Sequence, residues 1–108
     1  MTIILPAPVA GYFAAKNRHD VDGMLAPFAA AAVVRDEGRA HEGRAAIRAW
    51  MEETTKKYRV TVVPEAAAEE GGRLVVTGLV SGDFPGSPAR LTYRFALADG
   101  AIAGLEIG

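Results

Sequence analysis

The chain has 108 residues, of which 50% are hydrophobic and 23% charged, and its formal net charge is −1. This length and composition predict one globular domain, residues 1–108, that is soluble and cytoplasmic. The near balance of charges argues against non-specific nucleic-acid binding, and no apolar run approaches the roughly 20 residues needed to cross a membrane. Because the chain has no cysteine, it has no disulfide, thiol nucleophile or cysteine-ligated metal.

The first half of the chain has helical periodicity. Val9, Tyr12 and Phe13 recur at spacings of three and four residues, so they share one face of a helix. Pro6 suits the start of this helix, because proline lacks the amide hydrogen that would be unpaired in a first turn. We expect the helix to end near Asn17.

Two further helices and a short strand are predicted before the middle of the chain. Asp20 is expected to cap a short second helix that ends at Pro27. Residues 32–36 are predicted to form a short strand, with a turn at residues 37–39. The longest helix is predicted from Arg44 to about Tyr58, because its apolar residues lie on one stripe. That stripe consists of Ile47, Trp50, Met51, Thr54 and Tyr58.

The second half of the chain alternates with a period of two, which predicts β-strands. Pro64 cannot donate a hydrogen bond to a neighbouring strand, so its strand should lie at a sheet edge or contain a bulge. Asp99 and Gly100 predict a tight hairpin turn. Helices followed by an antiparallel meander indicate an α+β fold with the helices on one face of the sheet. The expected strands are residues 59–68, 73–83, 89–98 and 101–107.

Three stretches, residues 20–28, 33–36 and 43–50, are similar to the nuclear transport factor 2-like superfamily. The resemblance covers the chain from about Val9 to Ile107 and is closest to the SnoaL-like (polyketide cyclase-like) and ketosteroid isomerase-like members. It implies three N-terminal helices packed on a curved antiparallel sheet, a cone-shaped α+β barrel around a hydrophobic pocket. The superfamily includes isomerases, cyclases and binding modules, so membership alone does not name a reaction.

The resemblance to ketosteroid isomerases also implies roles for individual residues. Tyr12 corresponds to the tyrosine that hydrogen-bonds the substrate carbonyl, and Asp36 to the carboxylate that carries the proton. The second oxyanion donor of those enzymes falls on Leu91, which has no hydrogen to donate, and the tyrosine that supports the first donor falls near Met51. Efficient steroid isomerisation is therefore not expected.

Each candidate also has a structural interpretation. Asp36, Glu37 and Gly38 together are typical of a turn. The Tyr12 hydroxyl could bond a backbone carbonyl as easily as a ligand. His41 has the chemistry of a general acid or base but lies in a predicted surface loop. The two histidines are far apart and have no carboxylate at ligand spacing, and the glycines form no phosphate-binding motif, so neither a metal nor a cofactor is expected. The residues expected to line a ligand pocket are Phe28, Trp50, Met51, Leu91, Tyr93 and Phe95.

Two functions remain open from the sequence. The first is a proton-transfer enzyme of the isomerase or cyclase type, acting through Asp36 and Tyr12 on a small apolar ligand that bears a carbonyl. The second is a non-catalytic dimeric ligand-binding or accessory module of the same fold. Either is expected to be a homodimer, because Val75, Thr77 and Leu79 would leave apolar surface on the sheet face that the helices do not cover.

Overall fold

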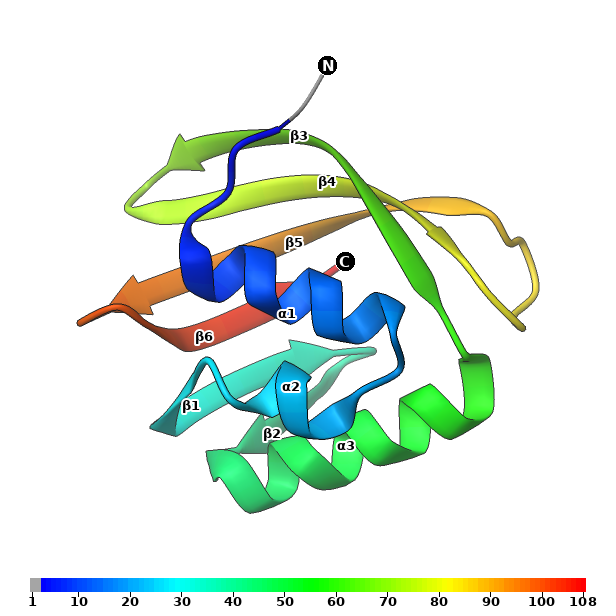
Figure 1. Ribbon diagram of the computed structural model, residues 1–108, viewed down its shortest axis with the longest axis horizontal. Coiled ribbons are helices and arrows are strands. Elements are labelled where there is room, and N and C mark those ends of the chain that lie inside the picture. The colour runs from blue at the N-terminus through cyan, green and yellow to red at the C-terminus, as the bar shows by residue number, and fades with distance from the viewer. Residues whose placement is uncertain (1–2) are drawn as a thin grey trace.

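Three helices lie on one face of a six-stranded sheet in the computed structural model, which describes residues 3–108 (Figure 1). The α+β class predicted from the sequence is confirmed. None of the described helices is long and apolar enough to span a membrane. The helices are α1 (Ala7–Asn17), α2 (Val21–Leu25) and α3 (Gly43–Tyr58), and the strands are β1 (Phe28–Asp36), β2 (Arg39–Glu42), β3 (Thr61–Glu70), β4 (Arg73–Ser81), β5 (Ala89–Ala98) and β6 (Ala101–Ile107).

The strands follow the order β2-β1-β6-β5-β4-β3, and each pair is antiparallel except β1 with β6, which is parallel. The expectation of a wholly antiparallel sheet is therefore wrong for this one pair of strands. The sheet is also open, since β2 and β3 form its two edges, so the cone does not close into a barrel. The parallel pair joins the N-terminal part of the chain to its last strand, and it places the end of β1 beside the end of β6.

The largest differences from the sequence prediction concern β1 and β2, while bounds of β3 and β4 differ from the predicted ones by two residues. β1 begins at Phe28 rather than at residue 32, and a register shift against β6 lies between Phe28 and Val33. The four residues between them are all alanine, so they carry no periodic signal. Residues 39–42 were expected to be turn and loop, but they form β2, which pairs with the end of β1. His41 is therefore held in a strand.

Local sequence signals are confirmed where they depend on backbone chemistry. The Asp20 carboxylate caps α2 by accepting a hydrogen bond of 3.1 Å from the Gly23 amide. Pro64 lies on the edge strand β3 beside a register shift. Asp99 and Gly100 have φ angles of 52° and 74°, as the predicted hairpin turn requires.

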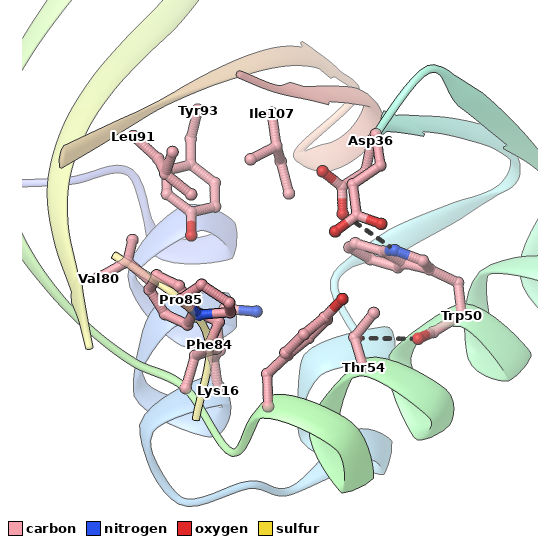
Figure 2. A pocket seen from close by; sticks show the side chains of 13 residues that line it. Lys16, Asp36, Trp50, Thr54, Val80, Phe84, Pro85, Leu91, Tyr93 and Ile107 are labelled. Carbon is pink, nitrogen blue, oxygen red and sulfur yellow. Dashed lines mark hydrogen bonds between the residues drawn. The ribbon is translucent and has the colours of Figure 1, made fainter. Parts of the chain in front are cut away.

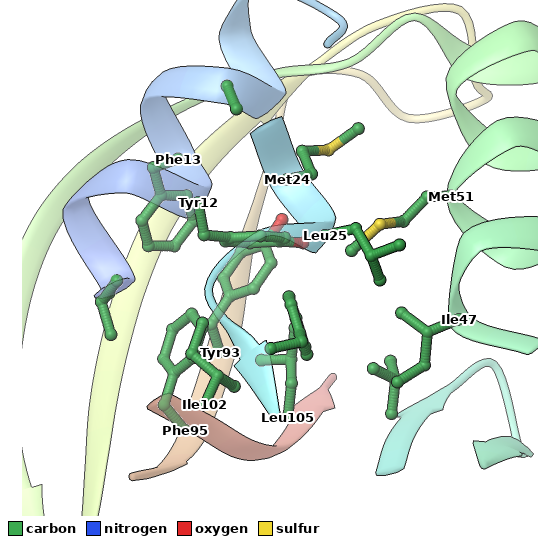
Figure 3. Close-up of a cluster of buried hydrophobic side chains, with 14 of the residues drawn as sticks. Tyr12, Phe13, Met24, Leu25, Ile47, Met51, Tyr93, Phe95, Ile102 and Leu105 are labelled. Carbon is green, nitrogen blue, oxygen red and sulfur yellow. The ribbon is translucent and has the colours of Figure 1, made fainter. Parts of the chain in front are cut away.

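The core lies between α1, α2, α3 and the sheet, and aromatic rings from α1 and β5 form much of it (Figure 3). The ring of Tyr12 meets those of Phe13, Phe28 and Phe95 edge to face, with centroids 5.3, 5.7 and 5.9 Å apart. The ring of Phe13 meets that of Tyr93 in the same way at 5.1 Å. This geometry suits the ring quadrupoles and fixes α1 against the sheet.

The C-terminal end of α1 is also attached to β3 by hydrogen bonds. The Asn17 side-chain amide donates to the Val62 carbonyl at 2.9 Å, and the Val62 amide donates to the Asn17 side-chain carbonyl at 2.7 Å. The Asn17 side chain thus hydrogen-bonds both the backbone carbonyl and the backbone amide of Val62. The last turn of α1 is fixed in position relative to the sheet.

Gly82, just after β4, is expected to be intolerant of a side chain. A methyl group there would lie 2.6 Å from the Tyr58 carbonyl oxygen and 2.8 Å from Val60 Cγ1, so the backbone at the end of α3 would have to move. We expect Gly82→Ala to lower the free energy of unfolding by about 2–3 kcal/mol, measured by urea denaturation. Gly11→Ala is the matched control. No atom lies within 4 Å of that added methyl, and alanine should raise the stability of α1 by about 1 kcal/mol. Equal stability of the two variants would contradict the prediction.

Candidate active site

A cavity of about 280 Å³ lies between the end of α1, one side of α3 and the inner face of the sheet (Figure 2). Most of its wall is apolar, but several elements each bring a polar group to it. Such a mixture of apolar surface and a few converging polar groups is typical of small-molecule sites. The lining residues are Lys16, Asp36, Glu37, Trp50, Thr54, Tyr58, Val60, Val80, Phe84, Pro85, Leu91, Tyr93 and Ile107.

Asp36 is the last residue of β1, and its carboxylate faces the cavity (Figure 2). The Trp50 indole donates a hydrogen bond of 3.2 Å to Asp36 Oδ2, which orients the carboxylate. Burial, and to a lesser extent the charge of Glu37, raises the pKa of Asp36, while the Trp50 hydrogen bond and the charge of Lys16 oppose the rise. A half-buried carboxylate with a raised pKa is a better proton acceptor than an ordinary aspartate.

Lys16 is the functional candidate that the sequence interpretation missed. The residue has only 9% of its surface exposed, and in Figure 2 its amine points into the cavity. Burial lowers the pKa of the Lys16 amine to about 8, although the charge of Asp36 opposes this shift. The amine lies 5.7 Å from the centre of the Tyr12 ring. A signal was present, because Lys16 continues the stripe of Val9, Tyr12 and Phe13 at spacings of seven, four and three residues.

Tyr93 on β5 also reaches the cavity, with its hydroxyl directed inward (Figure 2). Burial, together with the negative charge of Asp36, raises the pKa of Tyr93 well above its usual range. The phenol therefore stays protonated and is available as a hydrogen-bond donor. Asp36, Lys16 and Tyr93 together provide one proton acceptor and two donors around one apolar space.

The other predicted site residues divide into two groups. Like Asp36 and Tyr93, Trp50 and Leu91 line the cavity. Tyr12 lies in the core instead. It is fully buried, and among residues 3–108 its hydroxyl has no hydrogen-bond partner, because α1 directs the ring between those of Phe13, Phe28 and Phe95. Phe28, Met51 and Phe95 are likewise core residues that do not line the cavity.

His41 lies behind this site rather than in it. Its ring stacks on Trp50, with the ring centroids 5.7 Å apart and the planes 28° from parallel. β2 thus positions His41 to support the indole that binds Asp36. Packing against Trp50 is enough to explain the position of His41, so no catalytic role is assigned to it.

Comparison with known proteins agrees with this fold. A crystal structure of a candidate polyketide cyclase from Sinorhizobium meliloti is 42% identical in sequence, covers 96% of this chain and 95% of its own, and has a TM-score of 0.91. A protein with a ketosteroid isomerase-like fold from Catenulispora acidiphila, in complex with trimethylamine, is 20% identical, with coverage of 97% and 86% and a TM-score of 0.83. A nuclear transport factor 2-like protein from Cytophaga hutchinsonii is 17% identical, with coverage of 99% and 91% and a TM-score of 0.78.

The last two similarities show the fold alone. A search of curated proteins found no match. The SnoaL-like domain family model matches residues 9–105, nearly the whole chain. The chain therefore belongs to the SnoaL-like domain family.

Proposed function

We propose that this protein binds a small, largely apolar carbonyl compound in the cavity and moves a proton on it through Asp36. The observation that carries the proposal is the position of the Asp36 carboxylate, which has a raised pKa and faces the same apolar cavity as an amine and a phenol. Proton removal next to a carbonyl needs a base near the carbon and a donor near the oxygen. The cavity offers both.

In this proposal the hydrogen-bond donors are Tyr93 and Lys16, which reach the cavity, rather than Tyr12, which lies in the core. Asp36 removes a proton from the carbon next to the carbonyl, and the developing negative charge on the oxygen is stabilised by the Tyr93 hydroxyl or the Lys16 ammonium. Return of the proton from Asp36 to a different carbon completes an isomerisation. Alternatively, the carbanion attacks a second carbonyl carbon of the ligand and forms a ring; the π bond of that carbonyl breaks, and its oxygen takes the proton from Asp36. The Sinorhizobium relative described as a candidate polyketide cyclase supports chemistry of this type.

The test uses 2-indanone, a small cyclic ketone with acidic hydrogens next to its carbonyl. We expect it to shift the amide NMR signals of residues around the cavity, and we expect the protein to speed exchange of its α-hydrogens with deuterium from D₂O. Binding without accelerated exchange would favour the non-catalytic module over the enzyme. No shift at cavity residues with this ketone would count against the proposed ligand class.

The outer face of the sheet supports a second copy of the chain as partner, as the sequence suggested. Val75, Thr77 and Leu79 on β4 point away from the helices and stay partly exposed. This face is more polar than expected, because a shallow hollow beside these residues contains Arg35, Arg73, Arg94 and Glu106. Arg73 and Glu106 form an ion pair of 3.4 Å there. A two-fold interface would bury the apolar stripe and leave these charges toward its rim.

For this homodimer we expect light scattering at micromolar concentration to give about twice the chain mass of 11.4 kDa. Leu79→Asp should shift the mass toward the monomer, because it places a charge in the apolar stripe. Glu69→Gln, an exposed change near the tip of the β3–β4 hairpin, is the control. A monomeric wild-type protein, or a Leu79→Asp variant that stays dimeric, would contradict the proposed interface.

A further inference from the structure

Lys16 is a buried amine that contacts the Tyr12 ring but has no close carboxylate partner in the described part of the chain. Among residues 3–108, the ion pairs are all formed by arginines, and no carboxylate oxygen lies within 4.0 Å of the Lys16 amine. Burying a charged group without a close partner is costly, and a lysine at a surface can usually extend its amine into water. Here the amine extends into an apolar cavity instead (Figure 2).

The other two lysines provide a contrast within the same molecule. Lys56 and Lys57 are exposed in the last turn of α3, and neither lines the cavity. With a pKa of about 8, about half of the Lys16 amine is neutral at pH 8, compared with less than roughly 1% for an exposed lysine of ordinary pKa. Only the neutral amine has the lone pair that attacks a carbonyl carbon, and desolvation in an apolar pocket is one way to activate a lysine for this attack.

We propose that Lys16 is a nucleophilic amine that captures the carbonyl carbon of a small apolar aldehyde or ketone in this cavity as an imine. This inference rests on the proposed function only in that the cavity admits such a ligand; it does not require Asp36 to remove a proton from carbon.

The reaction is balanced with groups that line the cavity. The Lys16 nitrogen adds to the carbonyl carbon, and one of its hydrogens passes to the carbonyl oxygen to give a carbinolamine. Loss of that hydroxyl as water, with a proton supplied by a nearby acid, leaves a carbon–nitrogen double bond. The titratable groups that face the amine across the cavity are Asp36 and Glu37 at the end of β1, Tyr58 on α3 and Tyr93 on β5, with Tyr12 on α1 itself. We assign that proton to Asp36, because it lines the same cavity and is the carboxyl group whose charge acts on the Lys16 amine.

An imine would also make the Asp36 chemistry easier. A protonated imine withdraws electrons from the adjacent carbon more strongly than a carbonyl does, so a hydrogen on that carbon becomes more acidic. A carboxylate and an amine on opposite sides of one cavity then act on neighbouring atoms of the same ligand. Lys16 would bind the carbonyl carbon, and Asp36 would accept the hydrogen from the carbon beside it.

The test traps the imine with sodium cyanoborohydride, using 4-methylbenzaldehyde as the probe. This aldehyde has no hydrogen on the carbon next to its carbonyl carbon, so labelling does not depend on proton removal by Asp36. Reduction adds to the protein the mass of the aldehyde less one oxygen, and peptide mapping locates it. We expect labelling of Lys16 at pH 8 on the order of tenfold faster than labelling of Lys56 or Lys57.

Two variants and one competitor complete the experiment. Lys16→Arg keeps the positive charge but should lose the fast label, whereas Lys56→Arg should keep it. Guanidinium chloride should abolish the preference, because it depends on the fold. 4-Methylbenzyl alcohol, which cannot form an imine, should slow labelling by occupying the cavity.

Labelling spread evenly over the lysines, or equally fast in Lys16→Arg, would overturn the inference. NMR shifts of cavity residues with 2-indanone, which bears a carbonyl, test the binding part of the proposed function separately. If 2-indanone binds and Lys16 is not labelled, the inference is wrong while the proposed ligand class stands. If 2-indanone does not bind and Lys16 is not labelled, the inference and the proposed ligand class are both wrong.

Discussion

Replacing Asp36 with asparagine is expected to slow the protein-dependent exchange of the α-hydrogens of 2-indanone by at least about 100-fold. The asparagine side-chain oxygen can still accept the hydrogen bond from the Trp50 indole, so the local contact of 3.2 Å is retained. The amide cannot accept the proton. In the wild-type protein, exchange should become faster as the pH rises through the pKa of Asp36, which burial places above that of an ordinary aspartate.

The matched control for this experiment is Glu69→Gln, which removes an exposed carboxylate on β3 far from the cavity lining. Proton NMR follows the exchange, and the amide spectrum of each variant reports whether the fold is intact. If Asp36→Asn exchanges the ketone within about threefold of the wild-type rate while folded, Asp36 is not the base. That result would leave the binding-module alternative as the better description.

The second large effect concerns stability, and we expect Lys16→Met to make the protein more stable near pH 7. Burial lowers the pKa of Lys16 from 10.5 to about 8 in the folded chain, whereas the unfolded chain keeps the ordinary value. Below pH 8 both states carry the proton, and the folded state bears the full cost of the buried charge. That cost is about 3 kcal/mol, since each tenfold change in proton affinity corresponds to 1.36 kcal/mol.

The sign of the pH dependence distinguishes this cause from simple improvement of packing. Between about pH 8 and pH 10.5 the unfolded chain binds a proton on Lys16 that the folded chain has released. The free energy of unfolding of the wild-type protein should therefore rise with pH in this window, and its difference from Lys16→Met should shrink. Tyr12 and Tyr93, whose pKa values burial raises, affect both proteins alike at higher pH. A pH-independent difference in urea denaturation would show that the buried charge is not the cause.

Most of the fold could be predicted because its signals are local. The cap at Asp20, the edge position of Pro64 and the turn at Asp99 each follow from the chemistry of one or two residues. The parallel pairing of β1 with β6 could not be predicted in this way, because it joins segments about 70 residues apart that no hairpin turn connects directly. β2 was missed because its exposed, polar residues lack any alternation with buried ones.

The candidate site was predicted only in part, for a related reason. Asp36, Trp50, Leu91 and Tyr93 do line the cavity, because the ends of strands and one helical stripe bring them there. Tyr12 lies on the predicted face of α1, but along the helix that face meets first the core and then the cavity. A single turn of helix separates the two environments, and it is Lys16, one turn after Tyr12, that reaches the cavity. Sequence periodicity identifies the buried stripe but not the point along it where the core ends.

The double hydrogen bond between Asn17 and Val62 has a consequence for the residue beside it. A lysine near the end of a helix would normally escape burial if that last turn unwound or tilted, since its long side chain could then snorkel into water. The two bonds of 2.9 and 2.7 Å hold the turn against β3 and block that escape. Asn17 does not line the cavity, but its hydrogen bonds to Val62 keep the Lys16 amine inside it. We therefore expect loss of the Asn17 side chain to raise the pKa of Lys16 toward its ordinary value.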